Sequence, residues 1–277
     1  MKKAGIGLLV LGGLLYAALG DPEEHPEALL GAGLMLIGIL VYFRGRQLAA
    51  KSLAEGPASP LRDSKPDVLY LRSFRADASS PIKVLQSGFS TEEEQLADVL
   101  RPFGDMVAIG RPGEPLPLPG AARIYATDSE WKTVVLDRMR IAPLVVIRAG
   151  KGAGIFWELG QAISTLNPEK LLILVFNITT QEYREFADRA MQQFQLTLPN
   201  LGAYGVLRML VDYRENPSKV LAGFVRFSSA WTPEFLPLRF TLVRLGYNDF
   251  RNSFNAALRP VFEGHGFPWH PKGRFGA

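Results

Sequence analysis

The sequence contains no cysteine and only three histidines, His25, His265 and His270. Without cysteine the chain can form no disulfide, no thiolate-ligated zinc or iron–sulfur site, and no thiol nucleophile. Two of the three histidines lie in a C-terminal tail rich in glycine and proline, which argues against a histidine triad or a multi-histidine metal centre. We therefore expect no metal site and no resident cofactor, and we look for chemistry in carboxylates, arginines and glycines.

A strong excess of one charge is also missing. The 31 lysines and arginines and 27 aspartates and glutamates leave a net charge of +4 over 277 residues. This excess is small and dispersed, so we expect no nucleic acid among the partners. Within residues 1–50 four basic residues balance four acidic ones, and the excess therefore lies in the remainder of the chain. A similar bias suits a domain held beside anionic lipid.

Two long apolar runs stand at the N-terminus. Ala4–Gly20 and Ala28–Phe43 contain no charged residue, and the acidic segment Asp21–Glu27 separates them. Each run is close to the lower limit of about 17 residues for a helix that crosses a bilayer. Glycines such as those of Gly31–Gly33 allow helices to pack closely in lipid. The pattern predicts a transmembrane helical hairpin over residues 1–44, with the lipid bilayer as a partner.

Basic residues flank this predicted hairpin on both sides. Lys2 and Lys3 precede the first run, and Arg44 and Arg46 follow the second. By the positive-inside rule both ends are cytoplasmic, so we expect two spans in the cell membrane and a soluble domain in the cytoplasm. Two alternatives stay open. Residues 1–20 have the layout of a cleaved signal peptide, and the two runs could also form a buried hairpin in a soluble protein.

The chain becomes polar after the second run and then regular. Residues 45–66 contain Gly56, Pro57, Pro60 and Pro66 and are predicted to be a linker with a short helical start over 47–54. Residues 67–277 are predicted to form an α/β domain. Its four apolar strands are expected at Asp67–Phe74, Asp105–Ile109, Leu144–Arg148 and Lys170–Phe176.

Amphipathic segments alternate with these four strands. Helices are expected over 91–103, 127–139, 155–166 and 179–194, and three of them open on a capping-box pair: Thr91 with Glu94, Thr127 with Glu130, and Thr179 with Glu182. Continuous apolar strands between such helices predict a parallel sheet covered on both faces, in a flavodoxin-like or Rossmann-like sandwich. Strands at 205–211 and 221–228 and a last helix at 248–262 are expected as additional edge elements of the same domain.

Ligands of such sheets bind at the carboxyl ends of the strands, where three segments are expected to converge. They are Arg72-Ser73-Phe74-Arg75, the segment opened by Gly110-Arg111, and Arg148–Gly154. In the third, Gly150, Gly152 and Gly154 would let the backbone approach a ligand, and Arg148 and Lys151 add positive charge beside a helix start, as a phosphate cradle requires. A Gly-rich surface turn is the alternative. The arginines could bind phosphate bidentately or serve as ordinary ion-pair residues.

Trp157 and Glu158 follow this third segment on the predicted helix. Glu158 lies at the edge of the apolar stripe, near the strand ends, where a carboxylate could act as nucleophile, general base or acceptor for a ribose hydroxyl. The alternative is a glutamate favoured near a helix start by the helix dipole. Phe74 and Trp157 could stack on a base, although core packing is the default role for both.

These residues resemble two families of nucleotide-handling domains. In TIR domains an opening strand ends in an aromatic and arginine turn, similar to Ser73–Arg75, and a later strand leads through small residues to a tryptophan and a glutamate, similar to Leu144–Ala149 followed by Trp157 and Glu158. The stretch Glu158–Ala162 is also similar to nucleoside deoxyribosyltransferases. The resemblance covers about residues 67–176, and the adjacency of the Trp and Glu and the Pro-rich segment 110–120 depart from the TIR pattern.

The resemblance implies a TIR-like fold and a glutamate, Glu158, that acts at a ribosyl centre. Three hypotheses follow. The first is a membrane-anchored enzyme that cleaves the N-glycosidic bond of NAD or a related nucleotide in signalling or defence. The second is a domain that senses nucleotide or self-associates as a homo-oligomer without turnover. The third is a structural membrane protein with a vestigial cleft.

Overall fold

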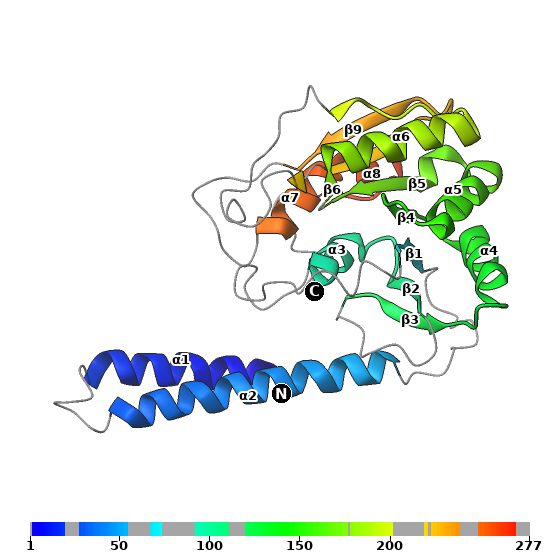
Figure 1. The fold of residues 1–277 in the computed structure, drawn as a ribbon. Helices are drawn as coiled ribbons and strands as arrows, with labels where there is room; N and C mark the ends of the chain where they lie inside the picture. The colour runs from blue at the N-terminus through cyan, green and yellow to red at the C-terminus, as the bar shows by residue number, and fades with distance from the viewer. Residues whose placement is uncertain are drawn as a thin grey trace. The chain divides into compact units, whose positions relative to one another are not determined.

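The computed structural model describes residues 2–19, 28–54, 67–73, 92–110, 120–176, 178–201, 219–220, 223–238 and 249–269 (Figure 1). These residues belong to two compact units, a helical pair near the N-terminus and an α/β unit that contains the sheet.

The helical pair consists of α1 (Lys2–Leu19) and α2 (Ala28–Ala54). The two helices approach so closely that a Cβ atom added to Gly12 would lie 2.6 Å from the carbonyl oxygen of Gly31. A Cβ atom added to Gly31 would lie 2.7 Å from the backbone nitrogen of Tyr16. Glycine is therefore required at both positions, because any side chain would force the helices apart.

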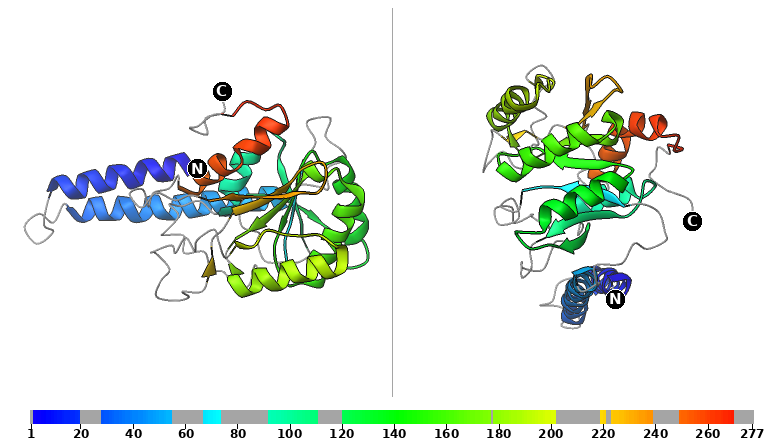
Figure 2. Two further views of the ribbon diagram at one scale, coloured as in Figure 1. Left: turned by 90° about the horizontal axis from the view of Figure 1, so that it is seen from above. Right: turned by 90° about the vertical axis from the view of Figure 1, so that its right-hand side faces the viewer.

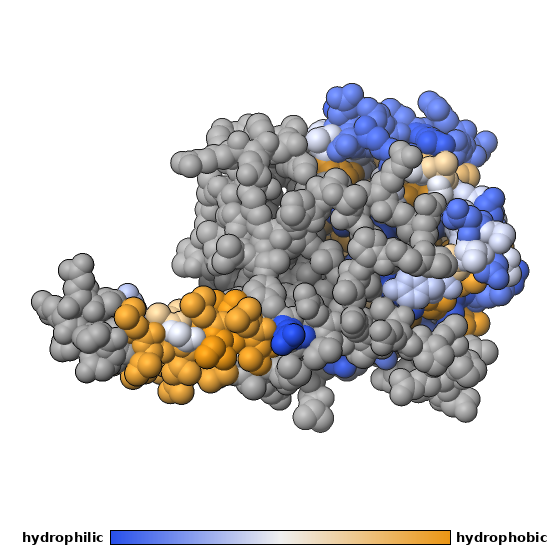
Figure 3. Space-filling view, turned by 60° about the horizontal axis from the view of Figure 1, so that its bottom comes forward, coloured by the Kyte–Doolittle hydropathy of each residue, from blue (hydrophilic) through white to orange (hydrophobic). Residues whose placement is uncertain are grey.

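The face of the helical pair seen in Figure 3 is mostly apolar over its described side chains. Leu14, Leu30 and Leu40 are each 66% exposed. Among the described residues, no helix combines the length and the apolar character that a membrane crossing needs.

Helix α2 ends later than the sequence predicts. A hairpin end at residue 44 and a separate helical start at 47–54 were expected, but α2 runs without a break to Ala54. The physical reason is local: residues 44–54 are mostly arginine, glutamine, leucine, alanine and lysine, which all favour helix, and one glycine at position 45 costs only about 1 kcal/mol.

A seven-stranded mixed sheet forms the centre of the α/β unit. In spatial order its strands are β3 (Ala122–Tyr125), β2 (Met106–Gly110), β1 (Val68–Leu71), β4 (Val145–Arg148), β5 (Leu171–Val175), β8 (Gly223–Phe227) and β9 (Pro233–Pro237). Neighbours from β3 to β5 are parallel, whereas β8 and β9 pair antiparallel. The parallel pairing predicted for the four apolar strands is confirmed. The sheet is mixed because two antiparallel strands extend one side.

Helices cover both faces of this sheet (Figure 2). One face packs against α4 (Trp131–Ile141), α5 (Ala153–Thr165) and α6 (Thr180–Phe194). The other packs against α3 (Glu92–Leu100), α7 (Asp249–Ala257) and α8 (Arg259–Gly264). The two-sided covering explains the strand sequences, since a strand buried on both faces needs apolar residues at successive positions.

The helix starts agree with the predictions in part. The capping box of Thr179 and Glu182 is present at α6. The Thr127–Glu130 pair instead closes a turn before α4, with Thr127 Oγ1 donating to Glu130 Oε2 at 2.6 Å, and the helix begins only at Trp131. Thr91, the predicted cap of α3, lies outside the described residues.

Elements near the C-terminus differ most from the predictions. The expected helix at 248–262 is two helices, α7 and α8, because Pro260 lacks the N–H that would continue α7 and suits the first turn of a new helix. The strand expected at 221–228 is β8, and it joins the same sheet as predicted. The strand expected at 205–211 lies outside the described residues. Strands β3 and β9, and the small antiparallel pair of β6 (Ile178–Thr179) and β7 (Lys219–Val220), were not predicted.

Candidate functional site

The direction in which successive strands are added to the sheet reverses between β1 and β4. From β1 the chain passes through α3 on one face to β2, and from β4 it passes through α5 on the other face to β5. In open α/β sheets a crevice forms outside the carboxyl ends of the strands at such a reversal, and ligands bind there. The segments that follow β1 and β4 are therefore the candidate site.

Two adjacent residues at the end of β1 point to opposite faces of the sheet. Arg72 Nη1 lies 3.2 Å from Glu93 Oε2 of α3, on one face. The Ser73 hydroxyl lies 3.5 Å from the place where a Cβ atom of Gly152 would stand, at the start of α5 on the other face. The predicted convergence of the first and third segments is thus present at Ser73 and Gly152.

The glycines of the third segment do not act as turn residues here. Positive φ angles occur among the described glycines at Gly104, Gly120, Gly223 and Gly266. Gly150, Gly152 and Gly154 are not among them, and a Cβ atom added to any of the three would meet its nearest neighbour no closer than 3.5 Å. A Cβ atom at Gly152 or Gly154 would make only ordinary van der Waals contacts, with Ser73 Oγ at 3.5 Å and with Trp131 Cη2 at 4.0 Å, so lack of space does not require glycine at these positions.

The two cations of the predicted phosphate cradle are turned away from each other. Arg148 Nη2 donates to the Phe176 carbonyl at 3.3 Å, and its guanidinium lies 5.5 Å from the Phe176 ring centre. Lys151 Nζ lies 2.9 Å from Glu185 Oε2 of α6, outside the sheet edge. In this structure each cation therefore binds groups of its own domain, and the predicted cradle is not assembled around the glycines.

A pair of tryptophans borders the start of α5. The ring centres of Trp131 and Trp157 are 4.8 Å apart in an edge-to-face arrangement, and Lys132 Nζ lies 5.4 Å from the Trp157 ring centre. Trp157 was a predicted site residue. Trp131 was not among the predicted site residues: it lies within the helix predicted over 127–139, and the sequence does not show that α4 and α5 begin side by side.

Glu158 is the most unusual side chain of this region. It is only 5% exposed, and its Oε2 atom is buried with no hydrogen-bond partner in the described part of the chain. Burial raises the pKa of its carboxyl group to about 8. Because α5 begins at Ala153, Glu158 is beyond the first helical turn, where the helix dipole would favour it. The dipole alternative therefore explains little of its position.

The surroundings of Glu158 follow from the contacts of its helix. Gly154 lies one turn earlier beside Trp131, and Thr165 lies two turns later with its Oγ1 atom 3.6 Å from Met139 Sδ. Both neighbours belong to α4, so the stripe of α5 that carries Glu158 faces α4. The carboxyl group is thus enclosed between two helices beside apolar and aromatic side chains.

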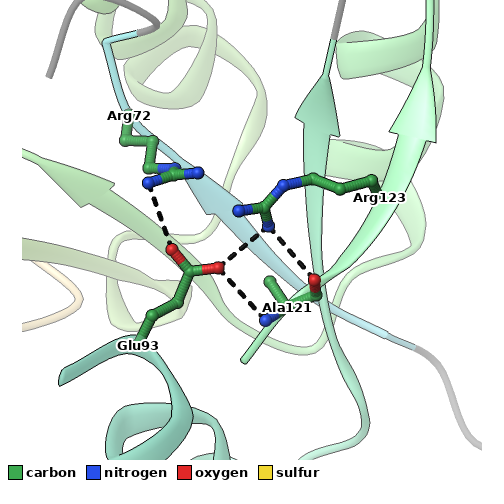
Figure 4. Close-up of polar contacts among 4 residues, drawn as sticks. All are labelled: Arg72, Glu93, Ala121 and Arg123. Atoms are coloured by element: carbon green, nitrogen blue, oxygen red, sulfur yellow. Dashed lines mark hydrogen bonds and ion pairs between the residues drawn. The ribbon is translucent and has the colours of Figure 1, made fainter. Parts of the chain in front are cut away.

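A second buried carboxylate lies on the opposite face of the sheet and was not predicted (Figure 4). Glu93 Oε1 accepts hydrogen bonds from Arg123 Nη1 at 2.9 Å and from the backbone nitrogen of Ala121 at 3.1 Å, while Arg72 binds its other oxygen. Gly120, at φ +147°, comes so close that its Cβ atom would lie 2.7 Å from the Glu93 carbonyl carbon. Only the folded chain shows this cluster, because Glu93 and Arg123 are 30 residues apart.

Tyr70 and Arg148 extend the polar edge of that face. Burial raises the pKa of Tyr70, and the positive charge of Arg148, which hydrogen-bonds its side chain, opposes this rise. Arg72, Arg123, Arg148 and Glu93 therefore share one side of the strand ends, and Ser73, Trp131, Trp157 and Glu158 share the other.

The remaining predicted site residues are placed as follows. Gly110 ends β2, and its carbonyl accepts a hydrogen bond from the backbone nitrogen of Ala126 at 3.1 Å. Phe74, Arg75 and Arg111 lie outside the described residues. Within the described ranges no group of histidines and carboxylates is arranged to hold a metal ion. Comparisons with family models, with curated proteins and with solved structures each found no match for this chain.

Proposed function

We propose that the α/β unit is a TIR-like domain that cleaves the N-glycosidic bond of NAD or a related nucleotide at the crevice between β1 and β4. The observation that carries this proposal is Glu158: a buried carboxyl group without a hydrogen-bond partner in the described residues, on the helix that leaves β4. Leaving such a group unpaired costs stability, so its presence beside a ligand crevice is a reason to assign it a chemical role.

The strand order supports the same proposal. Without the edge strand β3, the parallel strands run β2-β1-β4-β5. This is the beginning of the flavodoxin-like order, in which the ligand lies between the first strand and the third. Here those strands are β1 and β4.

The reaction requires a negative charge rather than an acid. Water adds to C1′ of the ribose, and the bond from C1′ to the pyridinium nitrogen breaks with its electron pair going to nitrogen. Nicotinamide leaves as a neutral molecule and one proton passes to solvent. Because the leaving group needs no proton, the ionised Glu158 carboxylate is the useful form, opposite the cationic charge that develops on the ribose. With its pKa raised to about 8, we expect the rate to rise with pH through that value.

The test compares Glu158→Gln with wild type, using the full chain and separating nicotinamide from ADP-ribose after incubation with NAD. Loss of the charge should lower turnover roughly a hundred- to a thousandfold, as the removal of one electrostatic group does in other active sites. Glu169→Gln, at an exposed position in the short turn Pro168–Lys170, is the matched control and should keep full turnover. Cleavage that survives Glu158→Gln would exclude Glu158 from the mechanism.

A second candidate function is a nucleotide-sensing or self-associating domain without turnover. The engagement of Arg148 by Phe176 and of Lys151 by Glu185 favours the self-associating form of this candidate, because neither side chain is directed at a phosphate site here. Nucleotide binding measured by calorimetry, without product, would support this candidate. The absence of both binding and cleavage would support a structural role with a vestigial cleft.

We further propose that α1 and α2 anchor the protein to the cell membrane with both chain ends in the cytoplasm. The exposed leucines of the helical pair and its basic flanks support this proposal. Retention in the membrane fraction after alkaline carbonate, and release by detergent, is the expected result. A reporter fused after Ala277 that is active only outside the cytoplasm would contradict the orientation.

A further inference from the structure

The Glu158 side chain is 5% exposed and lies on the stripe of α5 that faces α4. A helical side chain leans toward the N-terminus of its helix, so the carboxyl of Glu158 lies over the turn that contains Gly154. That turn is the place where the Trp131 ring reaches to 4.0 Å from the Gly154 Cβ position. Trp131 in turn rests edge-on against Trp157, the neighbour of Glu158 in sequence.

We propose that the Trp131 indole occupies a subsite for a planar aromatic base, and that such a base displaces it, stacks on Trp157 and thereby reaches Glu158. The proposal rests on the proposed function, because it names the part of the nucleotide that this side of the crevice takes. An edge-to-face tryptophan pair adds only a little stabilisation beyond its buried area, and a base stacked on an aromatic ring gains at least as much. Replacement of the Trp131 ring by a ligand base can therefore occur at little net cost in free energy.

We call the indole rings of Trp131 and Trp157 the cover of Glu158. The charged side chains nearby are engaged elsewhere, which agrees with a cover that is aromatic and not ionic. Helix α5 carries no charged side chain besides Glu158. On α4, Arg138 is paired with Asp67 and Arg140 with Asp137, while Lys132 lies over the tryptophan rings.

The neighbouring charges beyond α4 are engaged in the same way. Lys151 is held by Glu182 and Glu185, and Arg189 lies over the Phe156 ring. Burial is accordingly the cause of the raised pKa of Glu158, and removal of the cover should reverse it.

The experiment measures access to Glu158 directly. The full chain is treated with a water-soluble carbodiimide and an amine, and the extent of labelling at each glutamate is read by mass spectrometry. Trp131→Ala should raise labelling of Glu158 several-fold, and Trp131→Phe should raise it less. Trp231→Ala, which removes a tryptophan that packs on Phe227, should leave it unchanged.

Two glutamates in the same digest serve as internal controls. Glu169 is exposed and should be labelled equally in every variant, and Glu93 is buried by its ion pairs and should stay protected. Higher labelling of Glu158 together with Glu93 would indicate general unfolding, and Trp131→Phe then decides. Unchanged labelling of Glu158 in a folded Trp131→Ala protein would overturn the proposal.

Ligand measurements separate this proposal from the proposed function. In Trp131→Ala, where Glu158 is open to the reagent, saturating nicotinamide mononucleotide should protect Glu158 from labelling, and in wild type the same ligand should quench tryptophan fluorescence. In Trp131→Ala, the rise of turnover with pH should begin at lower pH, because solvent reaches the carboxyl group. If Trp131→Ala raises labelling of Glu158 but no nucleotide is cleaved, the proposed function is contradicted and the role of Trp131 in covering Glu158 is supported. If cleavage is seen but Trp131→Ala changes neither labelling nor the pH profile, the cover fails alone.

Discussion

Glu93 and Glu158 are two buried glutamates near the same strand ends, and their surroundings are opposite. Glu93, on the α3 face, is bound by Arg72, Arg123 and the Ala121 backbone. Glu158, on the α5 face, has one buried oxygen without a hydrogen-bond partner in the described residues. A buried carboxylate that is fully paired holds elements together, whereas one that is left unpaired raises the energy of the fold and is available to a ligand. The comparison gives Glu93 a structural role and agrees with the chemical role that we propose for Glu158.

The largest effect on stability is expected from removing the charge of Glu93, the paired carboxylate. Glu93→Gln should lower the free energy of unfolding by about 3–5 kcal/mol, because the buried Arg123 and the partly buried Arg72 lose a counter-charge. Urea denaturation followed by circular dichroism would measure this loss, with Glu169→Gln as the control. A loss below about 1 kcal/mol, the range of exposed pairs, would show that the cluster is not a structural centre and would remove the contrast between the two faces.

A change of opposite sign is expected on the unpaired side, and it depends on pH. The folded-state pKa of Glu158 is raised, so the folded protein binds a proton that the unfolded chain releases, and stability falls as pH rises from the unfolded pKa to about 8. Glu158→Gln should remove this dependence and leave the variant more stable than wild type at pH 9, by on the order of 4 kcal/mol.

Denaturation of both proteins at pH 5 and pH 9 would measure this difference. Equal shifts at the two pH values would mean that Glu158 has an ordinary carboxylate pKa, and the assignment of chemistry to its face would lose its main support.

A smaller effect is expected in the helical pair, where two glycines offer the same kind of comparison. A side chain at Gly12 would collide with the backbone of α2, while nothing in the described residues lies within 4 Å of a Cβ atom at Gly7. Gly12→Ile should therefore destabilise the pair by about 1–3 kcal/mol, the usual cost of overpacking, and Gly7→Ile should not. Hydrogen exchange of the α1 amides would report the difference, and equal protection in both variants would contradict the close helix crossing.

Local sequence was sufficient to predict those elements whose formation depends on neighbouring residues in the chain. The four apolar runs predicted as strands are β1, β2, β4 and β5, because a strand covered on both faces must be apolar at successive positions. The Thr179–Glu182 capping box is also read within four residues. Strand β9 was not predicted because its first and last residues, Pro233 and Pro237, are typical of a turn. Only its place at the sheet edge makes these prolines compatible with a strand.

In the candidate site, too, some features could be predicted from local sequence and others could not. Sequence spacing was enough to place Glu158 at the edge of a buried helix face and to bring Ser73 to Gly152, since both follow from the strand–helix alternation. The sequence could not show whether the side chains of Arg148 and Lys151 point to the same place, because side-chain direction depends on the pleat of the strand. In the structure the two side chains leave the sheet edge on different sides.

What the sequence determined by itself is the alternation of elements, the buried strands and the glutamate on α5. What only the tertiary structure decided is which groups meet those residues. Arg72, Glu93 and Arg123 come from β1, α3 and β3, and Trp131 comes to Trp157 from a different helix. The physical reason is that hydrophobic periodicity records how deeply a residue is buried. Pairing of charges and rings across elements depends on strand order and helix packing, which no local pattern contains.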